Sequence, residues 1–95
     1  MNNRKFYLVC YDIKDNKRRT NVFKKMRNYG TRVQFSVFEC IIDEKMLEKM
    51  IKEMLEIINE DEDSIRIYNI PESYKKFIKI LGVGEVVRDE KYFIV

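Results

Sequence analysis

The 95-residue sequence is 45% hydrophobic and 37% charged with a net charge of +3, which indicates one globular domain over residues 1–95. No apolar run reaches the roughly 18–20 residues of a membrane span, so we expect a cytoplasmic protein without a membrane partner. The sequence contains no histidine, which excludes a histidine general base, a histidine-activated nucleophile and a histidine-ligated metal.

The first predicted strand covers residues 5–13. It contains the apolar run Phe6–Cys10, which predicts burial on both faces. Asp12 stands at the end of this strand, directly before a polar turn and a basic helix. A carboxylate in this position can bind a metal ion next to a phosphate group. The alternative is that Asp12 only caps the turn into the helix, a role that Asp15 or Asn16 can fill instead.

Two segments have the periodicity of amphipathic helices. The first spans residues 17–29 and is closed by Gly30. Its side chains expected to face the core are Val22, Phe23, Met26 and Tyr29. The second spans residues 44–59 and is capped by Asp43. Its side chains expected to face the core are Leu47, Met50, Ile51, Met54, Leu55 and Ile58. The acidic residues 60–63 that follow predict a solvated loop.

The remaining apolar segments predict strands. Residues 32–42 contain no turn signal, so they form either one bent strand or a tightly broken pair. Residues 64–70 form a third β segment. Pro71 then opens a short helical segment that turns inward Tyr74, Phe77, Ile78 and Leu81. Residues 85–87 and 92–95 predict late strands that must find a partner strand.

These elements predict an α+β ferredoxin-like sandwich with a mainly antiparallel sheet and two helices on one face. Because the helices cover only one face and the first strand is apolar on both, we expect a homodimer that packs sheet against sheet. Two-fold symmetry then brings two copies of Asp12 together, and two carboxylates with water molecules can bind Mg²⁺. A metal-activated water is the expected agent of phosphodiester hydrolysis in a chain without histidine.

The charges are unevenly distributed along the chain. Residues 1–38 hold ten Lys and Arg against two Asp and Glu, whereas residues 39–63 hold three against ten. The basic first segment indicates a polyanion such as DNA or RNA as the partner. The alternative is that these cations only solvate helix faces that lie apart in the fold.

Several motifs, in this order, resemble one known family. They are Tyr11-Asp12-Ile13, the run 15–19, the run 32–40, Asp43-Glu44, residues 63–68 and Leu81-Gly82. Together they resemble the small ferredoxin-like CRISPR-associated protein of the spacer-acquisition module, the partner of the CRISPR integrase. The resemblance implies a homodimer that exchanges its C-terminal strands, here residues 82–95, bridges integrase subunits and holds DNA. It also implies a Mg²⁺-dependent endonuclease that cleaves single-stranded RNA or double-stranded DNA.

By matching position, the resemblance makes Asp12 the catalytic and metal-binding aspartate. It also implies roles in activity or substrate contact for Tyr11, Arg18, Arg19, Arg32, Ser36 and Phe38. We add Lys14 and Lys17 to the nucleic-acid contacts because they belong to the same basic stretch. Asn21 departs from the pattern, since some members have a basic residue there.

Two further functions remain open at this point. One is a DNA-bridging subunit without catalytic activity, which needs only the basic stretch and the dimer. The other is a toxin-like ribonuclease or a small regulatory dimer of the same fold, which leaves the Tyr-Asp-Ile and Ser-Val-Phe-Glu motifs unexplained.

Overall fold

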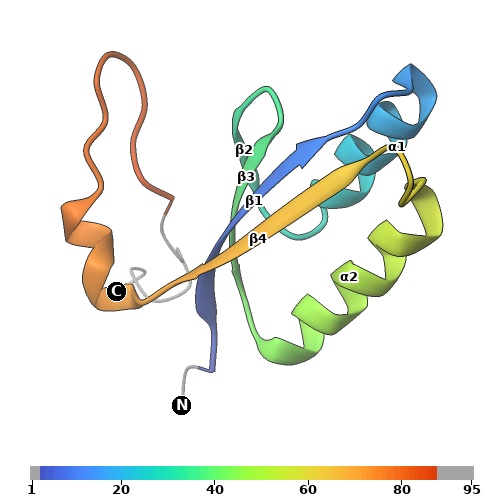
Figure 1. Ribbon diagram of the computed structural model, residues 1–95. Coiled ribbons are helices and arrows are strands. Elements are labelled where there is room, and N and C mark those ends of the chain that lie inside the picture. The colour runs from blue at the N-terminus through green and yellow to red at the C-terminus, as the bar shows by residue number, and fades with distance from the viewer. Residues whose placement is uncertain (1–2, 88–95) are drawn as a thin grey trace.

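A computed structural model of the protein describes residues 3–87. In chain order its elements are β1 (Lys5–Asp12), α1 (Asn16–Met26), β2 (Thr31–Gln34), β3 (Val37–Ile42), α2 (Glu44–Ile57), β4 (Ser64–Ile70) and the 3₁₀ helix η1 (Glu72–Phe77). The four strands form one sheet in the order β2-β3-β1-β4, and all neighbouring strands are antiparallel. Figure 1 shows α1 and α2 on the same side of this sheet. This arrangement confirms the predicted ferredoxin-like sandwich.

The core lies between β1 and the two α-helices. Tyr7, Val9 and Tyr11 alternate along β1 onto the helix-covered face and are buried. They pack in one cluster with Val22, Met26, Phe38, Cys40, Met50 and Met54. Each fully buried aliphatic side chain contributes roughly 1.5–3 kcal/mol, so this cluster fixes the position of the end of β1.

The other face of β1 is covered less completely. Phe6 is buried, and the Lys75 ammonium lies 5.0 Å from the centroid of its ring. Leu8 and Cys10 on the same face are only half-buried within residues 3–87. Burial on both faces of β1 is therefore confirmed for the helix side and for one end of the other side.

Residues 32–42 form a hairpin, so the tightly broken pair is the correct arrangement of the two that were considered. β2 pairs with β3 with an irregular register between Arg32 and Gln34, and residues 35–36 make the turn. No non-glycine residue in the described chain has a positive φ. This turn therefore needs neither glycine nor asparagine, which explains why the composition did not mark it.

Both helices begin where capping residues predicted. The Asp15 carboxylate accepts a hydrogen bond from the Arg18 backbone N–H at 2.9 Å, and the Asp43 carboxylate accepts one from the Met46 backbone N–H at 2.8 Å.

Among the described residues, no helix has the length and apolar character needed to cross a membrane. The expected inward position of Leu55 on α2 is wrong, because its side chain is 48% exposed.

Gly30 has a different role from the predicted helix closure. α1 ends at Met26, and Gly30 does not adopt a positive φ. A Cβ atom at this position would lie 2.5 Å from the Cys40 Sγ and 2.5 Å from the Glu39 carbonyl oxygen. Only a residue without a side chain allows the chain to pass this close to β3.

Gly30→Ala is expected to lower the free energy of unfolding by about 1–3 kcal/mol, because the backbone of β3 cannot move away from the added methyl group without strain. Urea denaturation of both proteins measures the difference. Asn28→Ala, at an exposed position in the same loop, is the control and should change stability by less than about 0.5 kcal/mol. Equal stability of Gly30→Ala and wild type would contradict the close approach.

The segment after β4 departs from the prediction. Tyr74, Phe77 and Leu81 were expected to point inward, but their exposed fractions are 58%, 64% and 95%. η1 is a short 3₁₀ helix, and Figure 1 shows the chain after it looping away from the sheet. These side chains therefore meet little of the core.

Residues 85–87 were expected to form a strand but have no strand conformation. The chain returns toward the sheet at this point, and the Val87 backbone N–H donates to the Glu39 carboxylate at 3.1 Å. This contact joins the segment to a side chain on the face of β3 and not to the backbone of an edge strand. The predicted strand 92–95 lies outside the described residues.

Candidate functional site

Asp12 is the last residue of β1, on the sheet face that the α-helices leave uncovered, and it is paired in register with Ser64. Its side chain is 69% exposed, and the Lys14 ammonium lies 3.1 Å from its Oδ2. Asp15 is the N-cap of α1, with the Arg18 backbone N–H as donor. The alternative that Asp12 caps the helix is therefore wrong, and its carboxylate is accessible to a ligand.

The turn after Asp12 is held in place by Asp63, the residue before β4. The Asp63 carboxylate accepts hydrogen bonds from the backbone N–H groups of Lys14 and Asn59, each at 2.9 Å. It also accepts a charge-assisted bond from the Arg18 Nε at 2.8 Å, and none of its side chain is exposed. The Arg18 Nη2 donates to the same carboxylate at 3.2 Å. Four donor groups around one buried carboxylate fix the path of the chain between β1 and α1.

These contacts correct one prediction and show what a second predicted site residue binds within the chain. Residues 60–63 are not uniformly solvated, because Asp63 is buried. The hydrogen bond from Arg18 holds the pKa of Asp63 well below its usual range. The same hydrogen bond raises the pKa of Arg18, which also donates to Glu62 at 3.2 Å. Arg18 was predicted to contact nucleic acid, but its guanidinium is occupied by these two carboxylates. Its role within this chain is to connect α1 to the start of β4.

The other cations of this stretch divide into two groups. Arg19 donates from Nε and Nη2 to the Ile13 carbonyl oxygen at 3.1 Å and 2.7 Å, so part of its guanidinium also stabilises the turn. Lys14 and Lys17 are exposed. The two lysines are therefore the cations of this turn that face solvent, as expected for contacts to phosphate.

A pocket of about 160 Å³ opens between α1 and the tip of the β2–β3 hairpin. It is lined by Tyr11, Arg19, Thr20, Phe23, Arg32 and Phe35. Burial raises the pKa of Tyr11, while the charges of Arg32 and Arg19 act in the opposite direction. The Tyr11 phenol is therefore neutral at neutral pH and offers an O–H group in a pocket flanked by two guanidinium groups.

Phe38 and Ser36 do not line this pocket but support it. Phe38 is 0% exposed, and its ring centroid lies 6.3 Å from that of Tyr11 and 6.0 Å from that of Phe23. Its predicted role as a nucleic-acid contact does not fit a fully buried side chain. The Ser36 carbonyl oxygen accepts from the Tyr11 backbone N–H at 3.0 Å, which connects the hairpin turn to the end of β1.

The described residues provide only part of a metal site. No group of three or more Asp, Glu, Cys or His side chains in residues 3–87 is placed to bind an ion. Glu39 lies on the same face as Asp12, but it pairs with Leu8, four residues back along β1, which corresponds to about 13 Å. Its carboxylate also accepts from the Val87 backbone N–H. The exposed Asp12 carboxylate fits Mg²⁺, which needs only one or two protein carboxylates besides water and phosphate.

Sequence reasoning missed three residues that shape this region. Asp63 was placed in a solvated loop because its partner Arg18 is 45 positions away, a separation that no local pattern reveals. Phe35 and Phe23 were assigned to a strand and a helix core, whereas both line the pocket. The one signal of this pocket in the sequence was an aromatic residue, Phe35, three positions after Arg32.

The sequence profile described as "CRISPR associated protein Cas2" matches residues 5–78. A protein of Chloroflexus aurantiacus named CRISPR-associated endoribonuclease Cas2 3 is 37% identical over 90 residues, which cover 95% of this chain and 97% of the relative.

Solved structures have the same fold. Cas2 of Streptococcus pyogenes matches with a TM-score of 0.74 and 34% identity over 81% of this chain and 99% of that chain. A chain from a structure titled "Partial Cas6-RT-Cas1--Cas2 complex" matches with a TM-score of 0.66 and 32% identity over 81% of this chain and 90% of that chain. The matched segment includes β1, α1, the hairpin, α2 and β4. This chain therefore belongs to the CRISPR-associated protein Cas2 family.

Proposed function

We propose that the protein is a metal-dependent endonuclease of CRISPR spacer acquisition, with Asp12 as its catalytic metal ligand. The observation that supports this proposal best is the position of Asp12. The Asp12 carboxylate stands at the end of a buried strand, and its side chain is 69% exposed. Asp12 is not needed as a helix cap, because Asp15 caps α1. The relative named an endoribonuclease is consistent with phosphodiester hydrolysis. Single-stranded RNA and double-stranded DNA are the proposed substrates.

Mg²⁺ is the proposed cofactor, and when bound it would lower the pKa of a water molecule and neutralise charge on the phosphate. The residues of the chain itself have distinct tasks. Asp12 binds the ion, and the exposed ammonium groups of Lys14 and Lys17 attract the phosphate backbone. Asp63 fixes the turn on which Asp12 and Lys14 lie. The direct test is cleavage by Asp12→Asn beside wild type, as argued in the Discussion.

The proposed active form is a homodimer that packs the uncovered sheet faces together. Leu8, Cys10 and Val37 on this face are only half-buried within one chain, and Tyr68 is 44% exposed. A second copy would bury this apolar area and bring a second Asp12 toward the first. Residues 82–95 are proposed to exchange between the copies. The integrase subunit is proposed as the further partner, since a related chain lies in a complex with Cas1. The cytoplasm is the proposed site of action.

Sedimentation equilibrium at micromolar concentration is expected to give a mass twice that of the chain, because apolar area on the uncovered face favours association. Deleting residues 91–95 should weaken the dimer by removing apolar burial and backbone pairing. The full chain is the control for the deletion. A stable monomer of the full chain at these concentrations would contradict the dimer.

A DNA-bridging subunit without catalysis is the second candidate. One observation favours it: the described residues of one chain place no group of three or more possible ligands together, and the Asp12 carboxylate is paired with Lys14. Electrostatic binding to a duplex needs the cations and the dimer but no metal ion. Binding measurements alone therefore do not separate the two functions, whereas cleavage by Asp12→Asn does.

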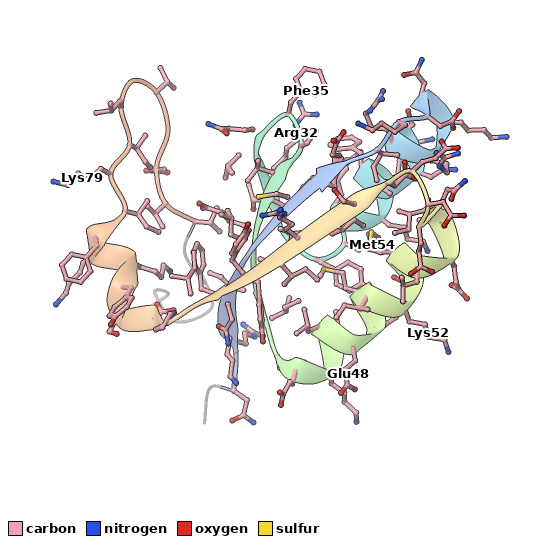
Figure 2. All side chains as sticks on the ribbon, in the orientation of Figure 1. Arg32, Phe35, Glu48, Lys52, Met54 and Lys79 are labelled. Atoms are coloured by element: carbon pink, nitrogen blue, oxygen red, sulfur yellow. The ribbon has the colours of Figure 1, made fainter. Side chains whose placement is uncertain are left out.

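Nucleic-acid binding is expected to weaken steeply with salt, because cations that neutralise phosphates release counterions. Lys17→Ala should make the slope of log K against log salt on duplex DNA shallower by about 0.9, the value of one phosphate contact. Fluorescence anisotropy across a salt series measures the slope. Lys52→Ala is the control, since Lys52 is also an exposed lysine but lies on α2, outside the basic stretch (Figure 2). Equal slopes for Lys17→Ala and wild type would contradict a phosphate contact at Lys17.

A further inference from the structure

The pocket between α1 and the hairpin tip combines aromatic rings with cations in a way that the hydrolysis of a phosphodiester does not require. Phe35 is 81% exposed although it is a large apolar side chain. The Arg32 guanidinium carbon lies 4.9 Å from the Phe23 ring centroid and 5.5 Å from the Phe35 ring centroid. Figure 2 shows Arg32 and Phe35 together at the tip of the β2–β3 hairpin. An exposed ring beside a planar cation is a surface on which another flat ring can stack.

We propose that this pocket binds one unpaired nucleobase, stacked on Phe35 and Arg32, and so gives the protein a binding mode for single-stranded RNA or DNA. The proposal rests on the proposed nucleic-acid function and names the part of the substrate that the pocket takes. Unpaired bases are recognised by stacking on aromatic side chains and arginine planes. A base inside a duplex is already stacked on both faces and cannot enter.

The size of the pocket fits this ligand. Its volume is about 160 Å³. A cavity of about 150 Å³ is known to hold one benzene ring, so this open pocket can take one flat ring but not a base pair. Tyr11 contributes a neutral phenol, and Thr20 a hydroxyl group, either of which can form a hydrogen bond with the edge of a base.

The pocket also lies beside the end of β1 that holds the candidate metal ligand. Tyr11 lines the pocket, and Asp12 is the next residue of β1 on the opposite face. Arg19 lines the same pocket and is anchored to the Ile13 carbonyl oxygen, so its charge stands at the end of β1. A base held by Phe35 would therefore lie at the same end of β1 as Asp12.

An exposed phenylalanine can also contact a protein partner. The charges around Phe35 argue against that occupant here, since Arg32 and Arg19 are both cationic and residues 31–38 contain no carboxylate. Two guanidinium groups around an aromatic pocket match a ring attached to a polyanion. An apolar peptide would have to desolvate both cations without neutralising them.

The test compares three probes on the full-length protein: a labelled single-stranded oligoadenylate, the same backbone with abasic sites, and a duplex. Phe35→Ala should weaken single-strand binding by about 5- to 150-fold, the range for one lost stacking contact. Binding to the duplex should change by less than about twofold, because it depends on phosphate contacts. Phe35→Trp should retain single-strand binding, and 2-aminopurine in the strand should be quenched by wild type but not by Phe35→Ala.

Phe77→Ala is the matched control. Phe77 is also an exposed phenylalanine, with the Lys76 ammonium 5.3 Å from its ring centroid, but it lies on η1 outside the pocket. It should leave single-strand binding unchanged. Unchanged single-strand affinity of Phe35→Ala, or equal losses on the single strand and the duplex, would overturn the base-binding pocket while leaving the proposed function intact. If wild type bound no probe with salt sensitivity, the proposed function would fail as well.

Discussion

Asp12→Asn is expected to slow Mg²⁺-dependent cleavage of RNA or DNA by about 10²–10³-fold, the usual effect of removing one group that stabilises developing charge. The amide is neutral and is a much weaker ligand for a hard cation than a carboxylate. The fold should not change, because Asp12 is 69% exposed and its ion pair with Lys14 is exposed as well. Exposed pairs of this kind contribute little to stability.

The assay compares single-turnover cleavage by proteins purified side by side, with and without a chelator. Asp61→Asn is the matched control, since Asp61 is an exposed aspartate in the loop before β4. The control should cleave as wild type does. Circular dichroism and salt-dependent binding should be the same for all three proteins. Cleavage by Asp12→Asn at the wild-type rate would leave the DNA-bridging function as the better account.

Asp63→Asn is expected to lower the melting temperature by on the order of 10 °C, the largest stability effect we predict for a single polar group in this chain. The amide carries no charge for Arg18, whose side chain is 25% exposed. It also cannot accept from all four donor groups as the carboxylate does. Donors that lose a buried acceptor carry a desolvation penalty. Scanning calorimetry at neutral pH measures the shift.

Glu62→Gln is the control for this prediction. Glu62 contacts the same guanidinium at 3.2 Å, but its side chain is 55% exposed, so its loss should shift the melting temperature only slightly. Equal shifts for the two variants would contradict the difference in burial on which the prediction rests.

The same carboxylate predicts a pH dependence. The pKa of Asp63 is lower in the folded protein than its ordinary value of 3.8, so the folded state binds fewer protons at this site than the unfolded state. The stabilisation is complete above the ordinary value and is lost as the pH falls below it toward the folded pKa. Asp63→Asn should remove this part of the acid sensitivity.

Local patterns in the sequence were sufficient for the parts of the fold that depend on neighbouring residues. The alternation along β1 and the 3.6-residue periodicity of α2 predicted which faces are buried, and Asp15 and Asp43 predicted where the helices begin. The position of Asp12 at the end of β1 followed from the same alternation. Asp12 is not needed as the cap of α1, because Asp15, three residues later, fills that role.

Long-range contacts explain what the sequence could not predict. The burial of Asp63 depends on Arg18, and the need for Gly30 depends on Cys40 of β3. The Phe35–Ser36 turn uses ordinary backbone conformations, so it has no characteristic residues. Each of these features is decided by the packing of segments that are far apart in the chain or by backbone conformations open to many residues.

The central claim, that Asp12 binds the metal ion, is tested most directly by metal binding without any cleavage assay. Mn²⁺ prefers the same oxygen ligands as Mg²⁺, and its bound fraction can be measured by electron paramagnetic resonance on the full-length protein. A contaminating nuclease cannot imitate this signal. We expect one Mn²⁺ per two chains of wild type and an affinity at least about tenfold weaker for Asp12→Asn. The same stoichiometry and affinity in both proteins would contradict the account.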